Sequence, residues 1–208
     1  MAKLNPEEAL KYLRWRRIGD CTRCDLHRSR KHVVFGEGDS DADVMFIGEA
    51  PGVEEDHKAR PFVGPSGTLL TWFIEQVGLR REQVYIANVL KCRPPENRDP
   101  EAEEIEACAP FLHTQIWLVQ PKVIVALGRF AGNLLTGEPF MSMGKLRTGL
   151  WTYENAKTQM SVPIVPTYHP TYVLRKRGSV VERQTKLKVI SDLQKALRYV
   201  EEGDELSV

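Results

Sequence analysis

Four cysteines are the residues of this sequence with the clearest capacity for metal chemistry: Cys21, Cys24, Cys92 and Cys108. The first two form a Cys-x2-Cys pair, a spacing that lets two thiolates converge on one metal centre. A second pair brought in from elsewhere would complete four sulfur ligands, which suit either zinc or an iron–sulfur cluster. The alternative interpretation is two unrelated pairs of buried or free thiols. Disulfides are not expected in the reducing compartment that we predict.

Three other polar residues stand just beyond apolar runs of the sequence. Glu49 follows Gly48 after the run 44–47, Asn88 follows the run 84–87, and His169 comes shortly after the run 162–166. We predict these runs as buried strands. Ligands of open α/β sheets bind beyond the carboxyl ends of the strands. We therefore expect a carboxylate, a carboxamide and an imidazole to meet in one crevice, although a lone Asn or His is more often a turn or surface residue.

Asn88 has the chemistry needed to recognise a nucleobase. Its carboxamide offers an acceptor and two donors in one plane, and uracil presents N3–H and O4 side by side. A pocket for an extruded base also needs an aromatic ring for stacking. Phe62, in the loop Arg60-Pro61-Phe62-Val63-Gly64, is the candidate, with ordinary core packing as the alternative.

Helices must alternate with these strands to position such a crevice. Helical periodicity or capping signals predict helices at about 5–18, 69–77, 101–119, 129–136 and 182–200, and a turn with an edge strand at 144–153. A further strand is predicted at 123–127, followed by Gly128. This alternation predicts an α/β fold: a single domain, residues 1–208, with a central, mostly parallel four-stranded sheet flanked by helices.

Composition narrows the possible function classes. The 208 residues are 42% hydrophobic and 27% charged, which excludes disordered and collagen-like chains. A net charge of +1 excludes a strongly basic nucleic-acid-binding surface over the whole chain, but not a local basic patch. The sequence lacks an apolar run long enough to span a membrane, and residues 1–8 do not resemble a signal peptide. We therefore expect a cytoplasmic protein.

Four segments of the sequence carry a resemblance to a known family. They are residues 48–56 (GEAPGVEED), 60–64 (RPFVG), 88–98 (NVLKCRPPENR) and 169–175 (HPTYVLR). With the cysteine spacing, they resemble the family 4 uracil-DNA glycosylases, the iron–sulfur-containing branch of the uracil-DNA glycosylase superfamily. The resemblance extends over about residues 21–197. Thr171 departs from it, because the family usually carries Ser there; Thr keeps the hydroxyl group.

The resemblance implies hydrolysis of the N-glycosidic bond of uracil in DNA, as part of base-excision repair. It implies a structural [4Fe–4S] cluster on Cys21, Cys24, Cys92 and Cys108, with residues 1–35 forming a cluster-binding segment packed on the domain. His169 is the expected donor to uracil O2, and Glu49 the expected general base or water-positioning group. The expected uracil-binding residues are Gly48, Glu49, Ala50, Glu55, Phe62, Asn88 and His169, with Glu55 near uracil C5, where it would help to exclude the methyl group of thymine.

The resemblance also implies a DNA-binding segment that begins at His169. Thr171, Tyr172, Leu174 and Arg175 are expected to contact DNA, through the minor groove or the phosphates. We expect Arg28, Arg30, Lys31, Lys91 and Arg93 to add to one basic face, although any one of them is more often simply solvated. The expected partner is uracil-containing DNA, bound by a monomer associated with the nucleoid.

Two other functions fit parts of the pattern. A non-catalytic, iron–sulfur DNA-binding module accessory to replication would share the cysteines, but the intact set Glu49, Asn88 and His169 argues against it. A zinc-stabilised nucleotide-binding protein would share the cysteines and the strand-end residues. Brown colour would separate a cluster from zinc.

Overall fold

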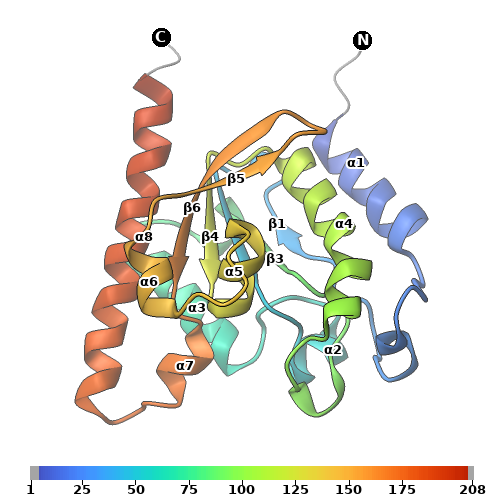
Figure 1. Ribbon diagram of the computed structural model, residues 1–208, viewed down its shortest axis with the longest axis horizontal. Coiled ribbons are helices and arrows are strands. Elements are labelled where there is room, and N and C mark those ends of the chain that lie inside the picture. The colour runs from blue at the N-terminus through green and yellow to red at the C-terminus, as the bar shows by residue number, and fades with distance from the viewer. Residues whose placement is uncertain (1–4, 206–208) are drawn as a thin grey trace.

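A computed structural model describes residues 5–205 of the chain, so residues 1–4 of the predicted N-terminal segment and residues 206–208 lie outside the described part. Its centre is a mixed six-stranded sheet in the order β1-β3-β2-β4-β6-β5 (Figure 1). The strands are β1 (Glu37–Gly38), β2 (Val44–Gly48), β3 (Tyr85–Asn88), β4 (Val123–Leu127), β5 (Trp151–Asn155) and β6 (Met160–Thr167).

The prediction of a four-stranded sheet is wrong in strand number. The four predicted strands are β2, β3, β4 and β6, and they form the parallel centre. Two antiparallel edge strands, β1 against β3 and β5 against β6, complete the sheet. β1 has two residues and no apolar run, so periodicity could not reveal it. β5 corresponds to the edge strand predicted within 144–153, and it is preceded by a helix rather than by a simple turn.

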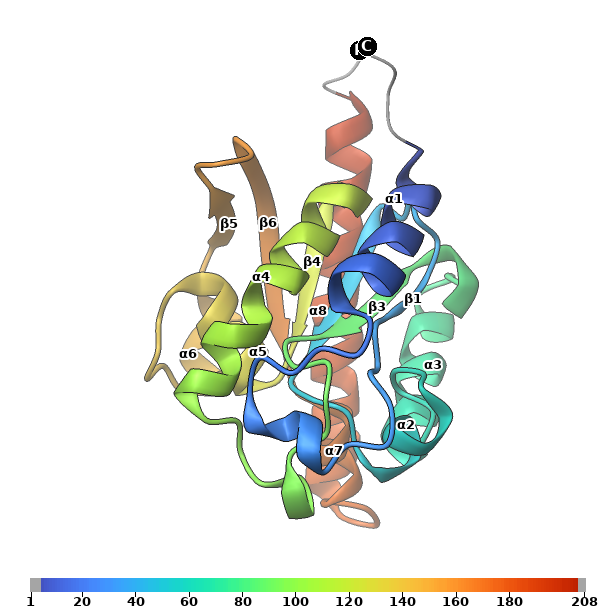
Figure 2. The same ribbon diagram turned by 90° about the vertical axis from the view of Figure 1, so that its right-hand side faces the viewer.

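The helices lie on both faces of the sheet. They are α1 (Pro6–Tyr12), α2 (Val53–Lys58), α3 (Pro65–Gln76), α4 (Ala102–Val119), α5 (Arg129–Thr136), α6 (Met143–Thr148), α7 (Pro170–Leu174) and α8 (Val180–Glu205). Figures 1 and 2 show α1 and α4 on one side of the sheet and α8 on the other. Asn5 caps α1, and a π-helix, Leu13–Ile18, continues it to the predicted end.

Burial explains why the central strands are continuous apolar runs. Every residue of β2 and β4 is buried, because a parallel strand covered on both faces has no side that meets water. On one face, Leu112 and Ile116 of α4 pack in a core with Met45 and Ile124. On the other face, Leu70 of α3 and Leu193 of α8 share a core with Phe46 and Val125. Within residues 5–205, no helix has the length and apolar character needed to cross a bilayer.

The strand order creates a crevice at the carboxyl ends of the parallel strands. The chain leaves β2 to form β3 on one side and later returns to form β4 on the other side of β2. Such a reversal of order separates the loops that follow neighbouring strands and is the usual ligand position in open α/β sheets. In Figure 1, β4 and β6 point down, toward the end of the molecule that holds α2 and α7. This end carries the candidate site.

Candidate functional site

A cavity of about 550 Å³ opens at the carboxyl ends of the parallel strands. The residues that follow all four strands contribute to it: Glu49 after β2, Asn88 at the end of β3, Gly128 after β4 and His169 after β6. The structure therefore brings together the three polar side chains that the sequence places 39 and 81 positions apart (88−49 and 169−88). Ala50, Glu55 and Phe62 also line the cavity.

Asn88 lies at the buried end of this cavity, with 2% of its surface exposed. Among the described residues, its Oδ1 atom is buried and has no hydrogen-bond partner. A buried acceptor without a partner is costly, so native proteins rarely retain one without a role. Gly48 makes this position possible, because a Cβ atom there would lie 2.4 Å from Asn88 Oδ1 and 2.5 Å from Phe62 Cζ. A planar ligand with an N–H group would satisfy the free oxygen.

Phe62 and His169 face the same space. Their ring centroids are 5.6 Å apart and the rings are tilted by 36°. Phe62 is buried, and its φ of 49° is a left-handed conformation that is uncommon for a residue other than glycine. An aromatic ring held against a carboxamide and an imidazole is the arrangement needed to stack a flat heterocycle and bond to its edge.

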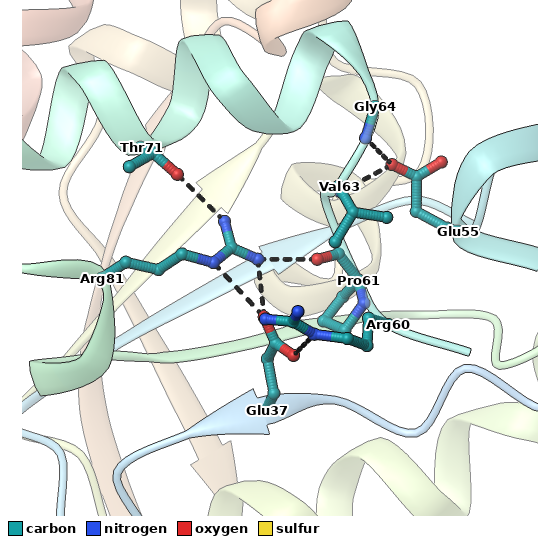
Figure 3. A network of polar contacts seen from close by, with 8 residues as sticks. All are labelled: Glu37, Glu55, Arg60, Pro61, Val63, Gly64, Thr71 and Arg81. Carbon is teal, nitrogen blue, oxygen red and sulfur yellow. Dashed lines mark hydrogen bonds and ion pairs between the residues drawn. The ribbon is translucent and has the colours of Figure 1, made fainter. Parts of the chain in front are cut away.

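Glu55 has a structural role that sequence reasoning did not identify. Its Oε1 atom accepts hydrogen bonds from the backbone N–H groups of Val63 and Gly64, both at 2.9 Å, and its Oε2 atom accepts one from Gly52 at 3.1 Å. Figure 3 shows the bonds to Val63 and Gly64. Glu55 thus connects the start of α2 to the loop that carries Phe62. It lines the cavity as expected, while contact with uracil C5 stays a prediction.

His169 is held as a neutral imidazole. Burial lowers its pKa to about 4, and the nearby Arg175 adds to this effect. The backbone N–H of Thr171 donates to His169 Nδ1 at 3.2 Å. A neutral ring that accepts at Nδ1 carries its proton on Nε2. The Nε2–H group is therefore available as a hydrogen-bond donor at any pH near neutrality.

The pKa of Glu49 is shifted upward, whereas that of His169 is shifted downward. Burial raises its pKa to about 7, and the negative charge of Asp99 adds to this rise, while Arg129 and Arg175 oppose it. A carboxylate with a pKa near neutrality is suited to accept a proton from water. Asp99 and Arg129 line the cavity but were not predicted. Arg129 directly follows strand-end Gly128, which could have indicated it; Asp99 lies in the loop after Cys92, and its sequence carries no such signal.

The predicted DNA-contacting segment forms α7 at the rim of the cavity. Thr171, Tyr172 and Arg175 line it, whereas Leu174 is half-buried and is not among the lining residues. Tyr172 is 39% exposed, and its ring stacks on Tyr168 with centroids 5.2 Å apart. The structure thus presents an aromatic and a cationic group beside the opening, but contact with DNA stays a prediction.

The four cysteines converge on a second, smaller cavity. All four line it, together with Arg30 and Lys91. The backbone N–H of Lys91 donates to Cys108 Sγ at 3.2 Å, and Arg30 Nη1 donates to Cys92 Sγ at 3.4 Å. Burial raises the pKa of the Cys92 thiol to about 12. Metal ligation is the usual means of stabilising a thiolate at such a buried position.

Within residues 5–205, no group of three or more His, Cys, Asp or Glu side chains is placed so that it could hold a metal ion. One detail of this region differs from expectation, because Arg30 and Lys91 do not belong to an exposed basic face. The Arg30 side chain is 6% exposed and Lys91 is 1% exposed, because both are directed toward the cysteines and neighbouring carbonyls rather than toward solvent.

Comparisons with known proteins agree with the geometry. Residues 35–194 match the family described as the Uracil DNA glycosylase superfamily. A Type-4 uracil-DNA glycosylase of Thermotoga maritima is 44% identical over 184 residues, covering 88% of this chain and 91% of the relative. A Type-4 enzyme of Archaeoglobus fulgidus is 43% identical, covering 86% and 90%. A third, from Sulfurisphaera tokodaii, is 47% identical over 160 residues, covering 74% and 71%.

Proposed function

Because the chain belongs to the uracil DNA glycosylase superfamily, we propose that it excises uracil from DNA by hydrolysing the N-glycosidic bond, in base-excision repair. The products are free uracil and an abasic site. The observation that carries this proposal is the convergence of Asn88, Phe62 and His169 on one cavity, with the Asn88 acceptor unpaired among the described residues. Uracil offers N3–H to that acceptor and O4 to the N–H group of the same carboxamide, an edge that cytosine lacks and thymine shares, so thymine must be excluded at C5.

The same residues supply transition-state stabilisation. As the bond from N1 to C1′ breaks, negative charge grows on uracil and the sugar becomes oxocarbenium-like. The His169 Nε2–H group donates toward O2, where part of that charge develops. A neutral imidazole suits this role, and its pKa of about 4 leaves it uncharged at neutral pH before the step. Phe62 stacks on the ring and keeps the leaving group in plane with these donors.

Glu49 activates the water molecule that attacks the sugar. Its carboxylate accepts a proton from the attacking water, which adds to C1′, and its negative charge favours the sugar cation. The pKa of about 7 leaves a large share of the group ionised at neutral pH. We assign Gly48 and Ala50 to the pocket wall that positions this carboxylate, and Glu55 to the wall near uracil C5.

We assign the DNA contacts to α7 and to Arg175, the residue that follows it. Thr171 and Arg175 are assigned to phosphates, and Tyr172 and Leu174 to the space left by the extruded nucleotide. Uracil-containing DNA is the substrate that the relatives' names support. We further propose that residues 1–208 act as one domain and as a monomer, in the cytoplasm on the nucleoid.

The donor set of the cysteine cavity fits a four-thiolate centre, because all four cysteines line this one cavity. The resemblance to the family 4 enzymes favours an iron–sulfur cluster over zinc. The cations Arg30 and Lys91 would offset part of the negative charge of four thiolates. We propose that Cys21, Cys24, Cys92 and Cys108 hold this cluster, with residues 5–35 packed around it. Its contribution is structural.

The decisive experiment measures uracil release from a uracil-containing oligonucleotide by the intact chain, followed by alkaline cleavage at abasic sites. We expect strand cleavage at the uracil position and none in the matched thymine oligonucleotide. DNA binding without uracil release would favour the accessory-module alternative. Absorbance in the visible iron–sulfur region, with iron and sulfide analysis, separates the cluster from zinc.

A further inference from the structure

The loop that carries Phe62 into the cavity is strained. Phe62 has a φ of 49°, a left-handed conformation that costs about 1–3 kcal/mol in a residue with a side chain. Its backbone also presses against α3, since a Cβ atom on Gly67 would lie 1.9 Å from the Phe62 carbonyl oxygen. Such a conformation persists only where neighbouring groups hold the chain on both sides.

Two charged side chains hold this loop from opposite sides (Figure 3). On one side, Glu55 accepts from the N–H groups of the two residues after Phe62. On the other side, Arg81 Nη2 donates to the carbonyl of Pro61, the residue before Phe62, at 2.7 Å. Phe62 thus lies between a backbone carbonyl that is hydrogen-bonded to Arg81 and two backbone N–H groups that are hydrogen-bonded to Glu55.

Arg81 is itself firmly anchored. Its Nη2 atom lies 2.9 Å from Glu37 Oε1, and its Nη1 atom donates to Thr71 Oγ1 at 3.2 Å. The Arg81 side chain is 14% exposed, so water competes little for these bonds. Glu37 belongs to β1, which pairs with β3 next to the strand end that bears Asn88. One guanidinium therefore connects the Phe62 loop, α3 and the sheet edge.

We propose that Arg81 is a positioning residue for base recognition: by holding the Pro61 carbonyl, it sets the Phe62 ring where an extruded uracil stacks. This inference rests on the proposed function. It assigns a role in uracil binding to a side chain that does not line the cavity and that acts through Phe62. Arg81 is expected to affect affinity for DNA only when a base occupies the pocket.

Arg60 offers a matched control within the same network. It also pairs with Glu37, at 2.7 Å, but its side chain is 61% exposed and its two hydrogen bonds both go to that carboxylate. Arg60→Met and Arg81→Met therefore each remove one cation from Glu37. Only Arg81→Met also releases the Pro61 carbonyl.

The test compares binding to two DNA duplexes by the intact chain. One carries 2′-fluoro-2′-deoxyuridine, whose fluorine disfavours the oxocarbenium-like state and so prevents cleavage; the other carries a tetrahydrofuran abasic analogue with no base to stack. We expect Arg81→Met to weaken binding to the first by roughly tenfold or more and to leave the second within about twofold. Arg60→Met should leave both within about twofold. A general loss of structure would weaken both duplexes alike, and that outcome would overturn the proposal.

A double-mutant cycle on kcat/KM for cleavable uracil DNA makes the test sharper. If Arg81 acts through Phe62, Arg81→Met costs little in a Phe62→Ala background, whereas independent effects would multiply and contradict the proposal. Should Arg81→Met be unfolded at the assay temperature, Arg81→Lys serves instead, because lysine keeps the charge beside Glu37 but lacks the fork that reaches the Pro61 carbonyl. An inactive wild type would reject the proposed function, whereas an active wild type matched by the Arg81 variant would reject this inference alone.

Discussion

The cavity at the strand ends, which we propose as the uracil pocket, and the cysteine cavity begin within four residues of each other, yet they are built in opposite ways. Asn88, the last residue of β3, lines the pocket, and Cys92 lines the cysteine cavity. The pocket is large, and it holds a buried acceptor that lacks a partner among the described residues and a strained aromatic residue. The cysteine cavity is much smaller, and the backbone N–H of Lys91 and the guanidinium of Arg30 donate to its sulfur atoms. A site for a transient ligand keeps polar groups without hydrogen-bond partners until the ligand binds. A site for a permanently bound group surrounds its ligating atoms with hydrogen-bond donors from the protein.

One buried cation joins the two regions. Lys91 is 1% exposed, and its Nζ atom donates to the carbonyl oxygen of Asn88 at 2.7 Å. Burial lowers its pKa to about 8, while the nearby Cys108 and Cys92 oppose that fall. Lys91 therefore contacts both regions, through its side chain at Asn88 and through its backbone N–H at Cys108. Even so, the two regions should fail differently when their own side chains are removed.

The largest expected effect belongs to the pocket. Asn88→Ala and His169→Ala should each lower kcat/KM on uracil DNA by roughly 10²–10³-fold, because each removes a preorganised contact to the leaving base. Bound iron and thermal midpoint should stay close to those of the wild type. Asn133→Ala is the control, since its Oδ1 atom is likewise buried without a partner among residues 5–205, but away from the cavity lining. Wild-type cleavage by both pocket variants would show that the pocket is wrongly assigned.

The next effect belongs to the cysteine cavity and should fall on stability. Cys92→Ala should lose visible absorbance and iron and lower the thermal midpoint by about 10 °C or more, because ligation energy is folding energy. His169→Ala, measured beside it, should keep its colour. Iron content at the wild-type level in Cys92→Ala would refute the ligand assignment. A loss of activity at temperatures where that variant is still folded would make the two regions less separate than we infer.

Sequence reasoning found the parts of both regions that leave a pattern. The strands β2, β3, β4 and β6 are apolar runs, so the sequence alone places the residues after them at one sheet edge. Lys91 and Arg30 were expected at the surface, because nothing in a sequence distinguishes a lysine that points inward from one in solvent. The influence of Asp99 on Glu49 depends on how the loop after Cys92 folds back, which short-range pattern cannot reveal.

A smaller effect tests the electrostatics of the pocket. The acid limb of kcat/KM should follow the ionisation of Glu49, so the rate rises with pH through about 7. Burial is the largest cause of the raised pKa of Glu49, and the negative charge of Asp99 is the second. Asp99→Asn should therefore move this limb to lower pH and increase the relative rate at pH 5.5. Glu49→Gln should lose the limb and most of the activity. An unchanged limb in Asp99→Asn would mean that another group controls the profile.

The smallest expected effect concerns the stability of the fold, which the pocket lowers through Glu49 and the cysteine cavity raises. The pKa of Glu49 rises on folding from 4.5 to about 7, so folding holds its proton more tightly. The stability from this group is complete below pH 4.5 and is lost as pH rises through about 7. Glu49→Gln cannot ionise, and should therefore raise the thermal midpoint by roughly 2–4 °C above pH 7, allowing for partial exposure of the carboxylate, and by nothing at pH 4. Thermal melts at pH 4 and pH 8 measure this, and equal shifts at both would show that the gain comes from packing and not from the buried charge.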